Sequence, residues 1–159
     1  MRDQTKKISG DQTVAVNRRG RFDYDIEESL EAGLMLTGTE VKSARQGQVQ
    51  LSEAYASLEP GPTHSPEVWI HGMHIAPYKQ GNVFNAEPRR KRKLLLHRHQ
   101  IDKLIGRVQQ KGQTLVPLKF YFTRGRAKLE LGIGKGRKQY DKRHAIAERE
   151  IRREMQSRE

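Results

Sequence analysis

The chain has 159 residues and a formal net charge of +12, because 31 Lys and Arg face 19 Asp and Glu. No apolar run approaches the roughly 20 residues that a bilayer requires, which excludes a membrane-spanning helix. The first twenty residues lack an apolar signal segment and the chain has no cysteine. We therefore expect a cytoplasmic protein without disulfides or thiolate metal sites.

The large apolar residues are concentrated in the middle of the chain. Leu, Ile, Val and Phe number 34, and 29 of them lie within residues 22–133. Segments poor in such residues cannot offset the conformational entropy that is lost on ordering. We therefore predict a flexible N-terminal arm over 1–20, a globular domain over 21–133 and a basic tail over 134–159.

The domain is predicted to begin with a strand and a short helix. Aromatic or aliphatic residues alternate with charged ones over 22–27, which is typical of a half-buried strand. The segment from Thr37 to Glu40 matches a capping box, which predicts a helix near 39–46 with Gly47 at its C-terminal end.

Strands and loops follow in short succession. The apolar pattern predicts a second strand over 49–58 and a third over 68–75, separated by a proline-rich loop at 60–67. Most of 77–92 is also predicted to be loop. Beyond it the apolar period changes and predicts a helix that ends at Gly112, with one face formed by Leu94, Ile101, Leu104, Ile105 and Val108. The pattern leaves open whether this helix begins before or after residue 96.

A hairpin closes the domain. Two strands are predicted over residues 115–123 and 127–133, joined by a turn at Arg124 and Gly125. Strands that do not alternate regularly with helices argue against a doubly wound parallel sheet. We predict a mainly β (α+β) fold, namely an OB-fold-like small antiparallel β-barrel with two to three helices and a flexible basic C-terminal tail.

Charge is distributed unevenly along the chain. Residues 89–131 hold thirteen basic and two acidic residues, whereas 21–88 hold four basic and ten acidic ones. This polarity suggests one face for a polyanion with an acidic side kept away from it, and clustered Lys and Arg favour a nucleic-acid partner. The alternative is a merely soluble basic surface.

The densest basic run is 89–93, which directly precedes three leucines. Within a folded domain such a run could hold phosphates, while Leu95 or His97 packs on an exposed base or sugar. A nuclear-targeting run is the alternative interpretation.

The histidines and glycines predict no catalytic or metal site. His71 and His74 would point to opposite faces of a strand, and His97 and His99 would diverge near a helix start. The glycine-rich segment 132–136 matches no nucleotide-binding motif, so we predict no bound nucleotide there and no cofactor.

The tail combines cations with one tyrosine, since Tyr140 lies among five basic residues between positions 135 and 143. That combination suits RNA contact, and residues 144–159 favour helix. We predict that the tail is disordered when free and folds on binding, with a plain solubilising tail as the alternative.

Several motifs together resemble one family. From about residue 17 to residue 143, the chain is similar to small protein B, the SsrA-binding proteins of bacterial trans-translation, and the motifs that carry the likeness are 26–34, 38–43, 92–97 and 132–143. The resemblance implies an OB-like barrel and a non-enzymatic factor that binds the tRNA-like domain of transfer-messenger RNA. It also implies support of the alanylation of that RNA and its delivery to stalled ribosomes.

The resemblance further implies partners and site residues. Besides the RNA, the partners are the stalled ribosome with its small-subunit RNA and, indirectly, elongation factor Tu with GTP and alanyl-tRNA synthetase. Glu31, Leu95 and His97 match RNA-binding positions of the family, and we add Arg92 and Lys93 from the basic run. The residues expected to probe the empty message channel are Lys135, Gly136, Arg137, Lys138, Tyr140, Asp141, Lys142 and Arg143. The alternative function is a general single-stranded nucleic-acid-binding OB module, which requires several exposed aromatic residues on one sheet face.

Overall fold

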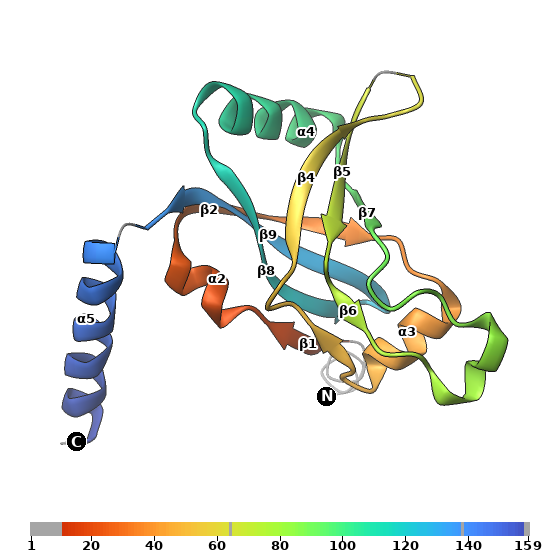
Figure 1. Cartoon of the computed structure of the whole chain (residues 1–159), viewed down its shortest axis with the longest axis horizontal. Helices are drawn as coiled ribbons and strands as arrows, with labels where there is room; N and C mark the ends of the chain where they lie inside the picture. Colours follow the sequence, from red (N-terminus) through yellow and green to blue (C-terminus); the bar gives the residue numbers. More distant parts are fainter. Residues whose placement is uncertain (1–10, 64, 138, 158–159) are drawn as a thin grey trace, which may run out of the picture.

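The computed structural model describes residues 11–63, 65–137 and 139–157. Most strands join one antiparallel sheet in the order β1-β8-β9-β2-β7-β5-β4, and β3 pairs with β6 in a small ribbon (Figure 1). The strands are β1 (Gln12–Val16), β2 (Tyr24–Leu34), β3 (Val49–Gln50), β4 (Tyr55–Pro60), β5 (Pro66–His71), β6 (His74–Ile75), β7 (Arg92–Leu95), β8 (Thr114–Thr123) and β9 (Arg126–Gly136). The helical segments are α2 (Arg18–Asp23), α3 (Gly38–Arg45), the 3-10 turn Lys79–Phe84, α4 (Arg98–Ile105) with its π-helical extension Gly106–Gln110, and α5 (Gln139–Ser157).

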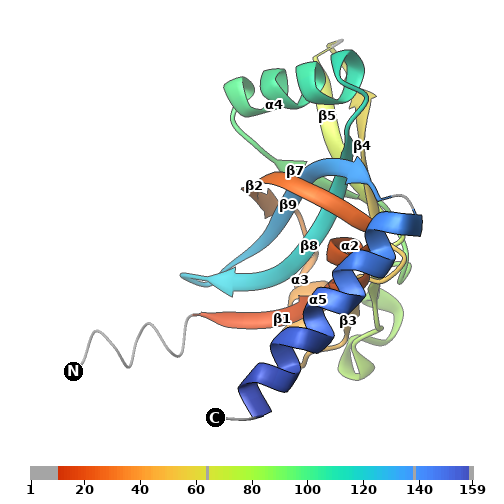
Figure 2. The ribbon, with the colours of Figure 1, turned by 90° about the vertical axis from the view of Figure 1, so that its left-hand side faces the viewer.

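The predicted mainly antiparallel fold with helices is confirmed, but the sheet is open where a closed barrel was expected. Its two edges are β1 and β4. The sheet is strongly curled (Figure 2), and β4 contacts β8 across the fold without joining it. Register shifts in β2 between residues 26 and 28, and in β8 between 117 and 119, mark bulges, which increase local twist and bend a sheet. The bending brings the two ends of the sheet near each other but does not close it.

The predicted N-terminal arm extends too far. Residues 12–16 form β1 and pair with β8, and α2 follows directly. Asn17, which is 4% exposed, caps α2 by accepting from the Gly20 amide at 3.0 Å and donates to the Pro117 carbonyl at 2.8 Å. Backbone pairing and this satisfied amide order a segment that has few apolar residues. Residues 1–10 lie outside the described part of the chain.

Two local predictions are confirmed by backbone geometry. Thr37 and Glu40 form the capping box of α3, and Gly47 just after the helix has a φ of +77°. At the tip of the β8–β9 hairpin, Arg124 and Gly125 have φ values of +52° and +76°. These left-handed conformations are the ones that a tight two-residue hairpin requires.

Other element boundaries differ from the sequence prediction. The strand predicted over 68–75 is split into β5 and β6 by Gly72, whose φ of +73° turns the chain, and the one over 49–58 is split into β3 and β4. The segment 22–23 belongs to α2. Leu94 is not helical: it lies in β7, which inserts between β2 and β5, and α4 begins only at Arg98. An apolar residue satisfies either pattern, and strand pairing decided the outcome.

One buried ion pair ties several elements together. Arg92 on β7 is fully buried, and its guanidinium lies 2.6 Å from Oε2 of Glu40 on α3, which is 5% exposed. The guanidinium also donates to the carbonyls of Met73 at 2.7 Å and Pro88 at 3.0 Å. Arg90 donates to the other carboxylate oxygen at 2.5 Å. The pair therefore connects α3, β7 and the loops at residues 73 and 88.

This network accounts for the ionisation of Glu40. Burial raises the pKa of its carboxyl group, but hydrogen bonds from Arg90, the Thr37 amide and Arg92 outweigh burial and hold the pKa below the ordinary 4.5. A lowered pKa in the folded state means that the carboxylate stabilises the fold above its ordinary pKa. That contribution is lost as pH falls through the lower folded-state value.

We predict that Glu40→Gln lowers the free energy of unfolding by about 3 kcal/mol near pH 7, because it leaves the Arg92 charge buried without its counterion. The measurement is urea unfolding at several pH values, and the difference from the wild type should shrink as pH falls below 4.5. Glu53→Gln is the matched control, since Glu53 pairs with Arg89 at a side-chain exposure of 74% and should cost about 0.5 kcal/mol or less. Equal losses in the two variants, or a difference independent of pH, would contradict the assignment.

Candidate nucleic-acid interface

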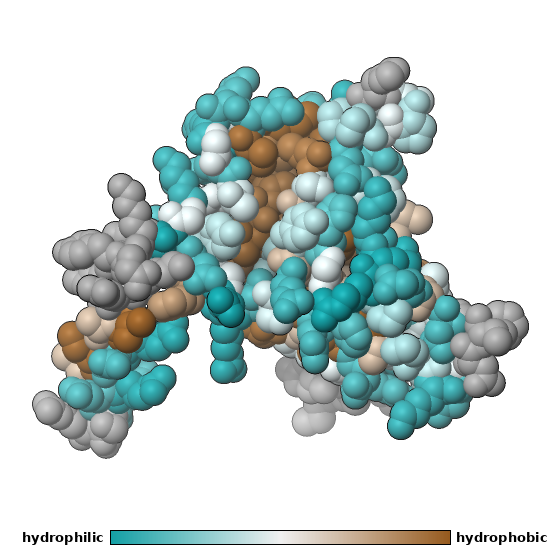
Figure 3. All heavy atoms as spheres, viewed as in Figure 1, coloured by the Kyte–Doolittle hydropathy of each residue, from teal (hydrophilic) through white to brown (hydrophobic). Residues whose placement is uncertain are grey.

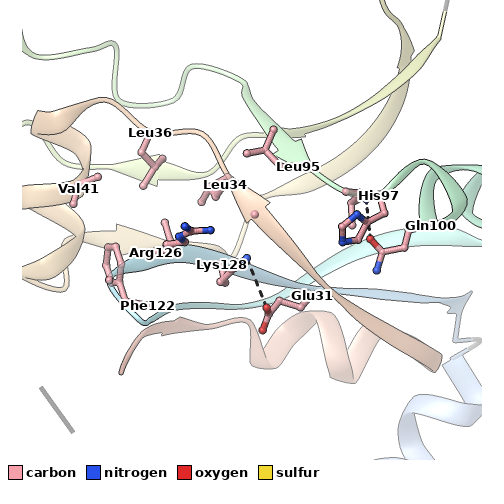
Figure 4. Close-up of a pocket in the computed structure, with 14 residues that line it drawn as sticks. Glu31, Leu34, Leu36, Val41, Leu95, His97, Gln100, Phe122, Arg126 and Lys128 are labelled. Carbon is pink, nitrogen blue, oxygen red and sulfur yellow. Dashed lines mark hydrogen bonds and ion pairs between the residues drawn. The ribbon is translucent and has the colours of Figure 1, made fainter. Parts of the chain in front are cut away.

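Three predicted site residues from distant parts of the sequence line one open groove (Figure 4). Glu31 on β2, Leu95 on β7 and His97 at the start of α4 border a hollow of about 750 Å³. Its lining also includes Gln100 on α4 and residues of the β8–β9 hairpin, among them Phe122, Arg126 and Lys128. The fold therefore assembles the groove from two strand pairs and the N-terminal end of a helix.

Strand register explains why Leu95 is exposed. Leu94 and its partner Leu34 point into the core, with exposures of 2% and 7%, so the next residue, Leu95, points outward and is 49% exposed. Its partner across the ladder is Gly33, and a Cβ there would lie 3.2 Å from the Leu95 Cβ. The glycine leaves the leucine uncovered on the groove side.

His97 is positioned by the start of α4. It has an extended backbone and occupies the N-cap position, and its amide donates to the Gln100 side-chain oxygen at 2.9 Å. The His97 and His99 rings stack with centroids 5.6 Å apart and planes 8° apart. The prediction that these two side chains diverge is therefore wrong, because the extended N-cap residue does not follow the helical rotation of the turn that begins beside it.

Glu31 is held on the outer face of the sheet. Its side chain is 50% exposed, accepts a hydrogen bond from the Tyr121 hydroxyl and has the Lys128 ammonium 3.8 Å away. Burial and the neighbouring Glu31 carboxylate both raise the pKa of Tyr121, so the phenol remains protonated.

Sequence reasoning missed the hairpin wall of the groove. Lys128 alternates with Ala127 and Leu129 along β9, so its outward position could have been read from the strand pattern. Arg126 is exposed and forms no ion pair with the described residues. The contribution of the two residues to this groove depends on the β2–β9 pairing, which no local pattern reveals.

The basic run 89–93 does not present a free row of cations. Each member faces a carboxylate of the acidic first half of the chain: Arg89 with Glu53, Arg90 and Arg92 with Glu40, Lys91 with Glu59, and Lys93 with Glu67. The predicted separation of an acidic side from a basic face is therefore wrong, because strand pairing interleaves the two halves. On the hairpin wall of the groove the pairing is weaker: Lys128 lies 3.8 Å from Glu31, and Arg126 forms no ion pair with the described residues.

The predicted RNA-binding role of Arg92 is also wrong. Its side chain has no exposed surface and all its contacts lie within the fold. Lys93 has a side chain that is 35% exposed and is paired at 2.5 Å with Glu67, in a neighbouring hollow of about 380 Å³. Its role in RNA binding stays a prediction.

The tail leaves the sheet in an ordered way. Lys135 and Gly136 end β9 opposite Asp25 and Tyr24, and the Arg137 amide donates to the Asp23 carbonyl at 2.8 Å. Helix α5 projects beside the sheet and is well separated from α4 (Figure 1). Tyr140, Asp141, Lys142 and Arg143 fall within α5, but their side chains, like the whole of Lys138, lie outside the described part of the structure. The predicted disorder of the free tail stays a prediction.

The described residues offer neither a metal site nor a membrane-spanning helix. None of their histidine and carboxylate side chains gather in a group of three or more that could hold a metal ion. None of their helices combines the length and the apolar character needed to cross a membrane.

A curled antiparallel sheet with a half-apolar, cation-bordered groove on its outer face defines a small β protein of the RNA-binding class. A model of the SmpB protein family matches residues 14–159, and the chain belongs to that family.

Known proteins agree with this assignment. The SsrA-binding protein of Acetivibrio thermocellus is 58% identical over 145 residues, covering 91% of each chain. That of Thermobifida fusca is 52% identical over 150 residues, covering 94% of this chain and 91% of its own. A solved structure described as "tmRNA-SmpB: a journey to the center of the bacterial ribosome" has a TM-score of 0.63 and 48% identity, covering 84% of this chain and 94% of its own.

Proposed function

We propose that the chain binds transfer-messenger RNA, the SsrA RNA, and acts without catalysis in bacterial trans-translation. The observation that carries the proposal is the meeting of Glu31, Leu95 and His97 in one groove. The names of the relatives as SsrA-binding proteins support the identity of the RNA. The ribosome named with the solved neighbour supports the setting.

The groove offers chemistry suited to folded RNA loops. An exposed leucine can pack on a ribose or an unstacked base, a carboxylate can accept from a 2′-hydroxyl or a base amino group, and an imidazole can stack or donate. Arg126 and Lys128 on the hairpin wall can neutralise phosphates that enter the groove. These groups recognise RNA by shape and hydroxyl contacts, which fits the tRNA-like domain as the ligand.

The finer steps belong to the same proposal. The bound protein supports alanylation of the RNA by alanyl-tRNA synthetase and accompanies it, with elongation factor Tu and GTP, to stalled ribosomes. The tail from Lys135 onward then enters the message channel only where no message fills it, so that incomplete proteins are tagged and the ribosome is released. The support for the tail's part is its composition and the helix that begins at Gln139.

A general single-strand-binding module is the second candidate, because one sheet face carries three rings. Tyr55, which is 56% exposed, stacks on His71 with centroids 4.9 Å apart, and Trp69 lies beside them in register with Ser57. Lys91 covers the Trp69 ring at 4.5 Å and pairs with Glu59 at 2.9 Å. The face is thus partly occupied and carries acidic residues, which makes it a weaker phosphate track than the groove.

The test of the proposed function is a gel-shift titration of transfer-messenger RNA at about 150 mM salt, with ordinary tRNA and single-stranded RNA as competitors. We expect binding to survive both competitors at equal mass. Equal displacement by single-stranded RNA would support the general module and overturn the proposal.

We predict that Arg126→Ala weakens RNA binding about fivefold and reduces the slope of log affinity against log salt by about one, because it removes one phosphate contact. Arg89→Ala is the matched control: Arg89 is also a partly exposed arginine, but its guanidinium is 3.2 Å from Glu53, so we expect an unchanged slope. A slope that falls equally in both variants would show that RNA meets the basic run and the hairpin wall alike.

We predict that ending the chain after Arg137 leaves affinity for free RNA within about twofold but abolishes tagging on stalled ribosomes. Truncation there keeps the β2–β9 ladder and the Arg137 amide bond, so the groove stays intact. The two measurements are the same titration and a reconstituted tagging assay. A large loss of affinity would place the RNA site in the tail.

A further inference from the structure

The contacts of Glu31 span three neighbouring strands. Across the β2–β9 ladder Glu31 lies opposite Glu130, and Lys128 lies opposite Gly33. Across the β8–β9 ladder Lys128 lies opposite Tyr121. The Tyr121 hydroxyl, on a strand that does not pair with β2, reaches across β9 and donates to the Glu31 carboxylate.

A carboxylate is an unusual group to present to a polyanion. It repels phosphates, and Glu130 beside it adds a second acidic group, which pairs with Arg21 at 2.8 Å. A carboxylate has about four acceptor directions. The Tyr121 hydroxyl takes one of them and Lys128 lies 3.8 Å from the other oxygen, while half of the side chain stays exposed. The Glu31 carboxylate therefore has unused acceptor positions on its solvent-exposed side, where a hydroxyl or amino group can donate to it.

On the basis of the proposed function, we propose that Tyr121 is a positioning residue that aims the Glu31 carboxylate at RNA hydroxyl and amino donors. The acceptor held in this way makes the groove prefer RNA over the same strand lacking 2′-hydroxyls.

A tyrosine suits this task better than a second cation. A lysine or arginine in its place would form a close ion pair and occupy the carboxylate, whereas a neutral hydroxyl fixes one oxygen and leaves the charge intact. A tyrosine hydroxyl is protonated at physiological pH in any case, and burial and the Glu31 carboxylate raise the pKa of Tyr121 further. The Lys119 ammonium lies 5.2 Å from the Tyr121 ring centroid, which adds a further restraint on the ring.

The test uses Tyr121→Phe, which keeps the ring and removes the donor, in the full-length chain. Two probes are titrated at fixed salt: the tRNA-like domain of transfer-messenger RNA, and the same RNA with 2′-deoxy substitutions through its loops. We expect Tyr121→Phe to weaken binding of the first probe about fivefold and to reduce the preference between the probes. Glu31→Gln should reduce the same preference, and adding Tyr121→Phe to it should change binding by less than about twofold.

Two controls separate this role from a structural one. Tyr78→Phe removes a half-buried tyrosine hydroxyl in the loop after β6, which does not line the groove, and should leave both affinities unchanged. Tyr121→Phe should keep the wild-type melting temperature and salt slope, because neither the core nor a phosphate contact is altered.

The outcomes also separate this inference from the proposed function. If the wild type binds the probe no better than an unrelated hairpin, the proposed function fails. The inference fails alone if the wild type is selective but Tyr121→Phe keeps the wild-type preference between the probes. It also fails alone if Tyr121→Phe lowers RNA affinity by the same factor in the Glu31→Gln background as in the wild type, because Tyr121 then does not act through Glu31.

Discussion

The buried pair of Arg92 and Glu40 is the constraint on which the rest of the fold depends. A guanidinium without exposed surface is tolerable only if every donor is satisfied, and this one finds a carboxylate and two backbone carbonyls. Those partners fix α3 and two loops around β7, so β7 can lie only where Arg92 points inward. The alternation of a strand then places Lys93 and Leu95 outward. The exposure of Leu95 in the groove is thus a consequence of a charge buried three residues earlier.

The same alternation determines where positive potential remains. Four acidic residues of the first half of the chain form ion pairs with the basic run 89–93, namely Glu40, Glu53, Glu59 and Glu67. Another set, Glu27 and Glu28, binds Arg107 and Lys103 and fastens α4 and its π-helical extension to β2. On the β8–β9 hairpin beside the groove this pairing is weaker, since Lys128 lies 3.8 Å from Glu31 and Arg126 forms no ion pair within the described part of the chain. A separate apolar hollow lies between α4 and β4 (Figure 3). Leu58 and Ile105 are among the residues that line it.

How much the sequence could predict depended on the range of each interaction. The capping box at Thr37 and Glu40 and the hairpin turn at Arg124 and Gly125 were predictable because each depends on residues within a few positions. The burial of Arg92 was not, because its partner lies 52 residues away and a run of cations has no alternation of its own. Glu31, Leu95 and His97 were found together only through a family resemblance, since no spacing rule places β2 beside β7. Tyr121 and Lys128 could be assigned to an outer face, but not to a groove that two separate ladders create.

A groove that must hold RNA selectively needs more than positive charge, because charge alone attracts every nucleic acid at a given salt. In this fold the hairpin wall of the groove carries the cations Arg126 and Lys128, and the walls from β2 and β7 add a carboxylate and an exposed leucine. The carboxylate lowers affinity for a polyanion that presents only phosphates. It can accept a hydrogen bond from a polyanion that also presents hydroxyl or amino donors. Such a balance raises specificity at the expense of raw affinity, and it can operate only if the carboxylate has one orientation. The neighbouring strands supply that orientation, so under the proposed function RNA selectivity depends on sheet register as much as on the residues in the groove.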